Sequence, residues 1–316
     1  MSTETVLSDA PHPSEPPAAG PLGVTIVLPC FNEEGHVLDE VARITAAMDA
    51  SPHAADYELL VIDDRSTDRT LELLRDALPS YPRMRLLPFS RNGGSGTARR
   101  IGTNDARGRI VVWTDADMTY PNELIPDFVT YLHEHPECDQ VVGSRTSEQG
   151  THKWARVPAK WMIRRIASYL AQTDIPDLNS GLRAFRREVS LPYLRLLPPG
   201  FSCVTTITLA FLSNQHAVDY LPIEYAPRSG ASKFHPFRDA YRYILQVLRM
   251  IMYFNPIKVL MPLALWLFGI GVVKGIVDIS RYHVRLTTNS LLLIITGLIV
   301  AAVALLADLI VRSRAD

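Results

Sequence analysis

The pattern of apolar and polar positions predicts strands that alternate with helices over the first half of the chain. Short apolar runs predict strands at 24–28, 57–62, 85–87, 109–114 and 140–142. Segments with apolar residues at helical spacing predict helices at 34–49, 67–78, 96–106 and 122–134, the second with Ser66 as its N-cap. This alternation indicates an α/β domain built on a doubly wound, mostly parallel sheet.

Two longer apolar segments near the C-terminus predict a transmembrane hairpin. Residues 259–273 and 287–307 contain no charged side chain. Each is close to the ~20 residues that span a bilayer, and the segment between them is too short for more than a loop. We therefore expect helices at about 257–280 and 288–311, with a buried hairpin of a soluble protein as the alternative. Lys274 and Asp278 are one helical turn apart and can pair.

Between the α/β pattern and the hairpin, an apolar stretch carries arginines on one side. Arg238, Arg242 and Arg249 fall on one stripe of a helix, as in helices that lie in the membrane interface, although a soluble amphipathic helix has the same pattern. The predicted organisation is a disordered proline-rich tail at 1–22, an α/β domain at 23–235, an interfacial helix at 236–255 and the hairpin at 256–316.

Composition and charge narrow the class of protein. The chain has 316 residues, of which 47% are hydrophobic and 21% charged, and its formal net charge is -1. This balance argues against a general nucleic-acid binder. The three cysteines are far apart and odd in number, which indicates reduced thiols in a cytosolic domain. The tail has neither the basic nor the apolar region of a secretory signal.

Polar residues follow three of the predicted strands, at 28–34, 62–68 and 115–117. Loops that follow parallel strands converge on one edge of the sheet, so we expect a nucleotide pocket there. Asp63 or Asp64 is placed to accept a hydrogen bond from a base N–H. A glycine-rich turn at 92–96 allows close approach of a ligand to the backbone. The predicted nucleotide-binding residues are Pro29, Asn32, Glu33, Asp63, Asp64, Gly94 and Asp115.

The third of these loops carries the candidate metal site. Asp115 and Asp117 are two carboxylates one residue apart, directly after a buried strand. Such a pair can hold a hard divalent cation and leave open positions for phosphate oxygens. The pattern therefore predicts a clamp for a metal and a diphosphate, with an ordinary solvated turn as the alternative.

Taken together, these motifs resemble the family 2 glycosyltransferases with a GT-A fold, and among them the polyprenyl-phosphate (dolichyl-phosphate) sugar synthases. The resemblance covers about residues 24–255. It implies an inverting transfer of a sugar from a nucleotide-sugar to a lipid phosphate with Mg²⁺ or Mn²⁺. Similar proteins often have a glutamine where Thr119 stands. The matching stretches are 27–34 (VLPCFNEE), 61–70 (VIDDRSTDRT), 92–96, 115–121 (DADMTYP), 143–145, 177–183 and 228–233.

The expected acceptor region contains no carboxylate between residues 200 and 208. A sugar hydroxyl needs a general base, whereas a phosphate monoester is already largely dianionic at neutral pH. A lipid-phosphate acceptor therefore needs cations that bring two anions together. We expect the catalytic residues to be Asp117, Arg145, Arg183, Arg228 and Lys233, with surface ion pairs as the alternative for each cation.

These observations favour a membrane-anchored hexosyltransferase that uses a nucleotide-sugar and polyprenyl phosphate. GDP-mannose and UDP-glucose are the leading donors. The catalytic domain is expected to face the cytosol, at the inner membrane if the source is bacterial, and the hairpin offers a surface for contact with membrane lipid and for homo-oligomers. The alternatives are a processive polysaccharide synthase and a non-catalytic membrane protein that binds nucleotide-sugar.

Overall fold

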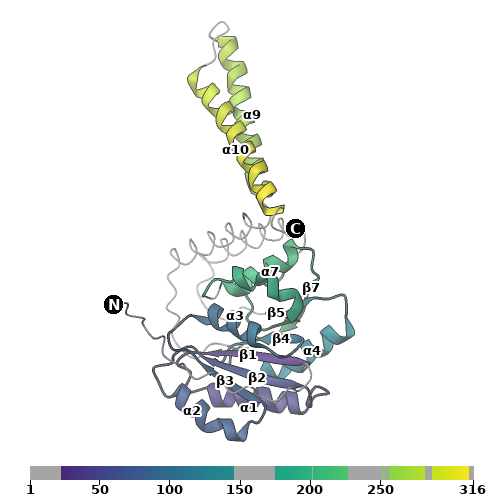
Figure 1. The fold of residues 1–316 in the computed structure, drawn as a ribbon. Coiled ribbons are helices and arrows are strands. Elements are labelled where there is room, and N and C mark those ends of the chain that lie inside the picture. The colour runs from purple at the N-terminus through teal and green to yellow at the C-terminus, as the bar shows by residue number, and fades with distance from the viewer. Residues whose placement is uncertain are drawn as a thin grey trace, which may run out of the picture.

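The computed structural model describes residues 23–145, 175–200, 202–226, 252, 256–281 and 287–312 (Figure 1). Within these ranges the chain forms an α/β domain and, after it, a pair of long helices. The predicted tail at 1–22 lies outside the described residues, and so does the predicted interfacial helix at 236–255 except for Met252.

A seven-stranded sheet with the order β3-β2-β1-β4-β6-β5-β7 forms the centre of the domain. Neighbouring strands are parallel except at β6, which is antiparallel to both β4 and β5. The predicted fold class, a mostly parallel α/β sheet, is therefore confirmed. The strands are β1 Val24–Cys30, β2 Tyr57–Asp63, β3 Met84–Pro88, β4 Ile110–Trp113, β5 Gln140–Arg145, β6 Arg183–Arg186 and β7 Val218–Ile223.

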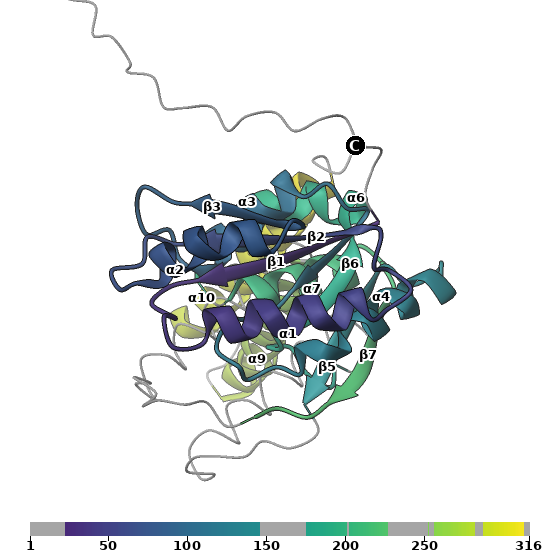
Figure 2. The ribbon, with the colours of Figure 1, turned by 90° about the horizontal axis from the view of Figure 1, so that it is seen from below.

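Helices cover both faces of the sheet (Figure 2). One face packs against α1 (Val37–Asp49), α2 (Thr70–Ala77) and α4 (Ile125–Glu134). The other packs against α3 (Ser95–Asp105), the short α6 (Arg187–Ser190) and α7 (Cys203–Ser213). Burial of both faces explains why the central strands are mostly apolar and do not alternate between apolar and polar residues. The described part of the domain also contains the 3₁₀ turns η1 (Leu78–Ser80), η2 (Asn122–Leu124) and η3 (Leu191–Leu196).

The starts of two helices differ from the prediction, because loop side chains compete for the backbone there. The helices expected from 34 and 67 begin at Val37 and Thr70. Ser66 is not an N-cap: its hydroxyl accepts a hydrogen bond from Asn32 N (3.0 Å). The Asp68 carboxylate instead accepts from Thr70 N (3.0 Å) and from the Thr70 hydroxyl (2.6 Å). Asp68, two positions before the first helical residue, thus satisfies a free N–H at the start of the helix.

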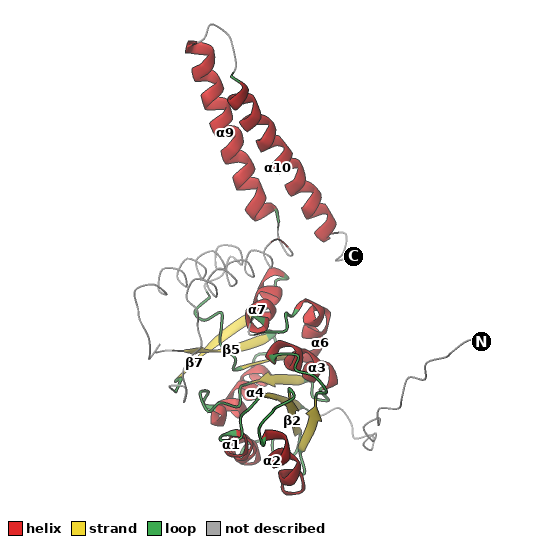
Figure 3. Cartoon of the chain, turned by 90° about the vertical axis from the view of Figure 1, so that its left-hand side faces the viewer, coloured by secondary structure: helices red, strands yellow, loops and turns green. Residues whose placement is uncertain are grey.

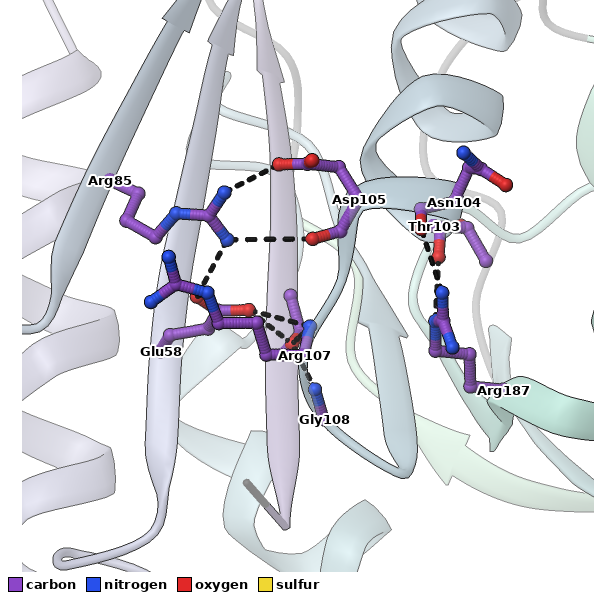
Figure 4. Close-up of polar contacts among 9 residues, drawn as sticks. Glu58, Arg85, Thr103, Asn104, Asp105, Arg107, Gly108 and Arg187 are labelled. Atoms are coloured by element: carbon purple, nitrogen blue, oxygen red, sulfur yellow. Dashed lines mark hydrogen bonds and ion pairs between the residues drawn. The ribbon is translucent and has the colours of Figure 1, made fainter. Parts of the chain in front are cut away.

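At the N-terminal ends of β1 and β2, a buried carboxylate joins several segments (Figure 4). Glu58 is only 3% exposed. It accepts hydrogen bonds from the Thr25 hydroxyl (2.7 Å), Arg107 N (2.9 Å) and Arg85 Nη1 (2.9 Å). Arg85 also donates to the Asp105 carboxylate (2.5 Å) at the end of α3. Removing one partner of a buried charge pair is costly, because the other charge stays uncompensated.

Glu58→Gln is therefore expected to destabilise the domain. We predict a loss of about 2 kcal/mol, since the neutral amide cannot balance Arg85 and Arg107. For a domain of this size the melting temperature should fall by about 4–8 °C in a thermal melt of the purified protein. The control is Glu72→Gln, whose side chain is 60% exposed beside Arg69. Exposed pairs contribute little, so an equal loss in both variants would contradict the prediction.

The C-terminal part forms a two-helix hairpin that projects away from the α/β domain (Figures 1 and 3). Helices α9 (Ile257–Arg281) and α10 (Thr288–Arg312) are antiparallel, and both are long and apolar enough to cross a membrane. A methyl group added to Gly297 would lie 2.7 Å from the backbone of Phe268, so the two helices approach closely there. The predicted long apolar hairpin is confirmed.

A cluster of polar side chains joins the two helices near their connection. Lys274 Nζ lies 3.3 Å from Asp278 Oδ2, so the expected pair forms. The same oxygen accepts hydrogen bonds from the hydroxyls of Thr287 (2.5 Å) and Ser290 (2.5 Å). Each charge is therefore compensated within the hairpin, as polar groups in an apolar setting require.

Candidate active site

A cleft of about 330 Å³ opens where β1 and β4 end. At this point the sheet order changes direction, with β2 and β3 on one side of β1 and β4 on the other. Such switch points are where open α/β sheets bind ligands. The cleft is lined by six of the predicted site residues: Pro29, Glu33, Asp64, Gly94, Asp115 and Asp117.

The loops after β1 and β2 brace each other, and Asn32 is the centre of this contact. Its side-chain oxygen accepts hydrogen bonds from Thr67 N (2.7 Å) and the Thr67 hydroxyl (3.2 Å). Its backbone N–H donates to Ser66 Oγ (3.0 Å), and Glu33 N donates to Thr70 Oγ1 (2.9 Å). Asn32 was predicted to bind nucleotide, but here its amide holds the two loops together outside the lining of the cleft.

Left-handed backbone conformations gather at these loops. Within the described ranges, three of the four non-glycine residues with positive φ are Asn32 (57°), Arg65 (56°) and Met118 (60°). They follow β1, β2 and β4 respectively. Such conformations cost energy in residues with a Cβ and persist only where the surroundings enforce them, often at functional sites. Three turns whose left-handed backbone conformation is imposed by their surroundings therefore border the cleft.

The two aspartates at the end of β2 have different surroundings. The Asp64 carboxylate accepts hydrogen bonds from Gly93 N (2.6 Å) and Gly94 N (2.7 Å), so both of its oxygens bind the glycine-rich turn. Asp63 is fully buried, and its Oδ2 accepts from Ser66 N (3.2 Å). Its Oδ1 has no hydrogen-bond partner within the part of the chain that the structure describes. Of the two candidates for a base N–H, Asp63 thus retains an acceptor oxygen.

The glycine-rich turn packs directly on the loop that precedes α7. Gly94 has a φ of 82°, and Gly96 N donates a hydrogen bond to Pro199 O (2.8 Å). A methyl group on Gly96 would lie 2.0 Å from Pro198 O and 2.7 Å from Gly200 O. Because Gly94 and Gly96 have no side chain, the backbone of this turn can lie against the backbone of the loop before α7. Gly200 of that loop forms part of the cleft wall.

Asp115 is held by a buried arginine that the sequence did not reveal. Arg99 of α3 is fully buried and donates from Nη2 to Asp115 Oδ1 (2.6 Å) and to Thr114 O (3.3 Å). Burial opposes the charge of this guanidinium, but the Asp115 carboxylate together with Cys203 and Tyr120 outweighs burial and raises the pKa of Arg99. Arg99 and Arg100 are adjacent in the sequence, and no local pattern tells which one faces the sheet.

Asp117 is oriented by its own loop. Its Oδ1 accepts hydrogen bonds from Thr119 N (3.3 Å) and from the Thr119 hydroxyl (2.5 Å). Thr119 is 1% exposed, so this hydroxyl is fixed in place. The residue at the position often occupied by glutamine therefore acts on the carboxylate of Asp117 in this structure.

The residues in the cleft fit the predicted Mg²⁺ or Mn²⁺. Asp115 and Asp117 line one wall and supply hard oxygen ligands. Within the described residues, no group of three or more His, Cys, Asp or Glu side chains forms a complete metal site. Mg²⁺ commonly binds through one or two carboxylates together with substrate phosphates, so this donor set suits a metal that arrives with a diphosphate.

Arg145 and Arg183 lie outside the lining of the cleft. Arg145 pairs with the Asp177 carboxylate through Nε (2.6 Å) and Nη2 (3.0 Å), and its guanidinium lies 5.3 Å from the ring centre of Tyr225. Despite its burial, the Asp177 carboxylate raises the pKa of Arg145. The structure therefore holds Arg145 in an internal ion pair.

Arg183 is fully buried and joins β6 to α7. It donates to Val204 O (2.8 Å) and Thr208 Oγ1 (2.7 Å), and burial, with Arg99 nearby, lowers its pKa to about 10. This placement gives no support to a direct contact with phosphate. Arg228 and Lys233, the other two predicted cations, lie outside the described residues.

Two further residues of the first loop line the cleft. Phe31 is 46% exposed, which is unusual for a phenylalanine and presents a flat apolar surface to a ligand. The neighbouring Cys30 is buried, and burial together with the Glu33 carboxylate raises the pKa of its thiol. Cys30 therefore stays protonated and is a poor nucleophile. The exposed aromatic ring becomes apparent only from the structure.

The chain is similar to known proteins in sequence and in fold. The family model described as "Glycosyl transferase family 2" matches residues 25–191, and the model "GtrB C-terminal hairpin" matches residues 255–313. The dodecaprenyl-phosphate galacturonate synthase of Rhizobium johnstonii is 27% identical over 238 residues, which are 75% of this chain and 68% of that protein. The dolichol-phosphate mannosyltransferase of Pyrococcus furiosus is 25% identical over 84% of this chain and 78% of its own length.

Other curated relatives are matched over only about half of their length. Among solved structures, the glucosyl-3-phosphoglycerate synthase of Mycobacterium tuberculosis in complex with Mn²⁺ and UDP-glucose has a TM-score of 0.56 at 20% identity. The match covers 73% of this chain and 79% of that one, and it supports the fold.

Proposed function

Because this chain belongs to glycosyl transferase family 2, we propose that it transfers a hexose from a nucleotide-sugar to a polyprenyl phosphate at a membrane surface. The observation that carries the proposal is the combination of an acid-lined cleft at the sheet switch point with a long apolar hairpin in one chain. The two relatives described above, named for dodecaprenyl and dolichol phosphate, support the acceptor class.

In this proposal the nucleotide-sugar occupies the cleft. Asp64, which lines the cleft, and the buried Asp63 behind it are the candidate acceptors for the base, and Phe31 offers a flat surface in the same cleft. Asp117 and Asp115 would hold Mg²⁺ or Mn²⁺ against the diphosphate, where the cation supplies charge compensation for the leaving nucleotide. GDP-mannose and UDP-glucose remain the first donors to test.

The acceptor is proposed to be the phosphate of a polyprenyl lipid. Its apolar tail would remain in the bilayer next to the hairpin, and its phosphate would reach the domain from the interface. A lipid phosphate is already ionised near neutral pH, so no enzymic base is required. Arg228 and Lys233, which precede the predicted interfacial helix in the sequence, are proposed to receive it, because guanidinium and ammonium groups both bind phosphate.

The orientation follows from the same proposal. Nucleotide-sugars are made inside the cell, so the catalytic domain would face the cytosol and the hairpin would enter the membrane from that side. In a bacterium this places the protein at the inner membrane. The hairpin also offers lipid-facing side chains, among them Trp266, Val273 and Leu309, which are 63%, 64% and 64% exposed.

The test is turnover by the full chain in liposomes that contain a polyprenyl phosphate. A panel of nucleotide-sugars is supplied with Mn²⁺ or Mg²⁺, and the lipid product is identified by mass spectrometry. We expect one sugar per lipid with an inverted anomeric configuration. A polymer would favour a processive polysaccharide synthase, and binding of a nucleotide-sugar without any transfer would favour a non-catalytic binding protein.

A further inference from the structure

Two buried polar residues behind the 115–121 loop have no part in the proposed transfer. Glu40 of α1 and Asn122, the first residue of η2, are both 0% exposed. Burying a carboxylate or an amide is unfavourable unless hydrogen bonds replace its water. The partners of these two side chains therefore indicate what they stabilise.

The Asn122 amide joins the two ends of the loop. Its oxygen accepts a hydrogen bond from the hydroxyl of Thr114, the residue that precedes Asp115. Its NH₂ group donates to Glu40 Oε1 and lies 3.5 Å from Asp115 O. Because an ionised carboxylate only accepts hydrogen bonds, the amide must present its NH₂ to Glu40 and its oxygen to Thr114.

Arg43, one turn after Glu40 on α1, holds the same loop at a further point. Its Nη2 lies 2.8 Å from Glu40 Oε1 and 3.2 Å from Oε2, and it also donates to Tyr120 O. The Glu40–Arg43 pair thus contacts the loop through Asn122 and through the backbone of Tyr120. Buried hydrogen bonds between charged and polar side chains favour a single arrangement of the groups that they join.

We propose that Glu40, Arg43 and Asn122 are positioning residues that fix Asp115 and Asp117 for the metal and the diphosphate. This inference rests on the proposed function of the two aspartates. An independent observation supports it: Met118, between Asp117 and Thr119, has a φ of 60°. A residue with a Cβ keeps a left-handed backbone conformation only where its surroundings enforce it. The network supplies that restraint from α1.

The network makes a specific prediction about exchanging its donors and acceptors. In Glu40→Gln the new amide oxygen can accept from Asn122 only while the new NH₂ group faces Nη2 of Arg43, which is also a donor. In Asn122→Asp two carboxylates face each other. In the double variant the new glutamine can donate to the new aspartate and still accept from Arg43, while the Thr114 hydroxyl keeps its acceptor. The two single variants should therefore be impaired and the double variant should recover.

The first measurement is hydrogen–deuterium exchange of the backbone amides in the 114–122 segment of the full chain. We expect exchange at least ~10-fold faster in each single variant and close to the parent in the double variant. If a single variant fails to fold but the double variant folds and exchanges like the parent, the result also supports the contact between residues 40 and 122. Parent-like exchange in both single variants, or no recovery in the double variant, overturns the inference.

Glu58→Gln is the matched control, since Glu58 is similarly buried and paired with an arginine at the opposite end of the strands (Figure 4). It should lower stability and leave exchange at 114–122 unchanged. Faster exchange there in this control would mean general destabilisation and would also overturn the inference.

The second measurement separates this inference from the proposed function. Binding of Mn²⁺ in the presence of UDP or GDP is followed by electron paramagnetic resonance, without any transfer reaction. We expect each single variant to bind Mn²⁺ at least ~10-fold more weakly, a cost of about 1.4 kcal/mol. If the parent binds no Mn²⁺ with either nucleotide, the metal part of the proposed function fails, whereas the exchange data still decide whether the network positions the loop.

Discussion

Asp117→Asn is expected to abolish sugar transfer, with a loss of at least ~1,000-fold in kcat/KM, about 4 kcal/mol of transition-state stabilisation. The asparagine keeps the shape of the side chain and can still accept the Thr119 hydroxyl. It cannot supply the negative charge that holds a divalent cation beside a diphosphate. The measurement is initial-rate kinetics over a range of Mn²⁺ concentrations.

Two variants show whether this loss comes from the metal site. Asp127→Asn changes an exposed carboxylate in the first turn of α4 and should leave the rate unchanged. Thr119→Val removes only the hydroxyl that orients Asp117, so we expect a smaller loss of about 10-fold, of the order of one hydrogen bond to a charged group. A normal rate for Asp117→Asn at ordinary Mn²⁺ would disprove the role of this carboxylate.

Gly96→Ala is expected to lower kcat/KM by about 100-fold, or about 2.7 kcal/mol. Its methyl group would lie 2.0 Å from Pro198 O and 2.7 Å from Gly200 O. Both atoms belong to the backbone, so no side-chain rotation relieves the contact and the loop before α7 must move. The cleft wall at Gly200 would move with it. Kinetics with a fixed lipid acceptor and varied donor measure the effect.

Two other glycines provide the controls for this variant. Among the described residues, chain neighbours aside, a methyl group on Gly35 or on Gly200 would meet no atom within 4 Å. Gly35→Ala should therefore be neutral. Gly200→Ala places a methyl group on the loop that Gly96 contacts, but without a clash, so it should retain most of the activity. Equal losses in Gly96→Ala and Gly200→Ala would mean that the loop position is not the cause.

The parts of the fold that the sequence predicted are those with strong local signals. Strands β1, β2 and β4 consist mostly of apolar residues, and Asp115 and Asp117 follow shortly after the last of these. Because loops after parallel strands meet at one edge, their polar residues could be placed in one cleft without coordinates. The hairpin could also be predicted from the sequence, because its helices contain long segments without a charged residue.

The parts that the sequence did not predict depend on contacts between distant segments. Strand β6 has only four residues and begins and ends with arginine, so it carries no apolar run. Helix α7 is buried on nearly all sides and rich in threonine, which removes the helical periodicity. Strand β7 has a proline near its end. Each acquires its structure from tertiary packing, which outweighs local propensity.

The same reason explains the hydrogen bonds of three polar residues near the site. Asn32 and Arg183 were expected to contact the ligands and Arg99 carried no prediction, whereas in the structure they bind partners 35, 25 and 16 positions away in the sequence. Whether such a side chain faces a ligand or an internal partner depends on the packing of several elements. The chemistry of the cleft was therefore predictable, whereas the residues that hold it in shape were not.

The antiparallel strand β6 has a consequence for the order in which the domain assembles. Strand β4 ends at Trp113, but its partner on one side, β6, begins only at Arg183. Strands β1 to β4 can pair before β6 has been made, because all four precede it in the chain. One edge of β4 then stays open until about 70 more residues have been made, a separation that slows folding and leaves a strand edge accessible to other chains. We expect nascent chains that end before β6 to be the form most prone to aggregation and most dependent on chaperones.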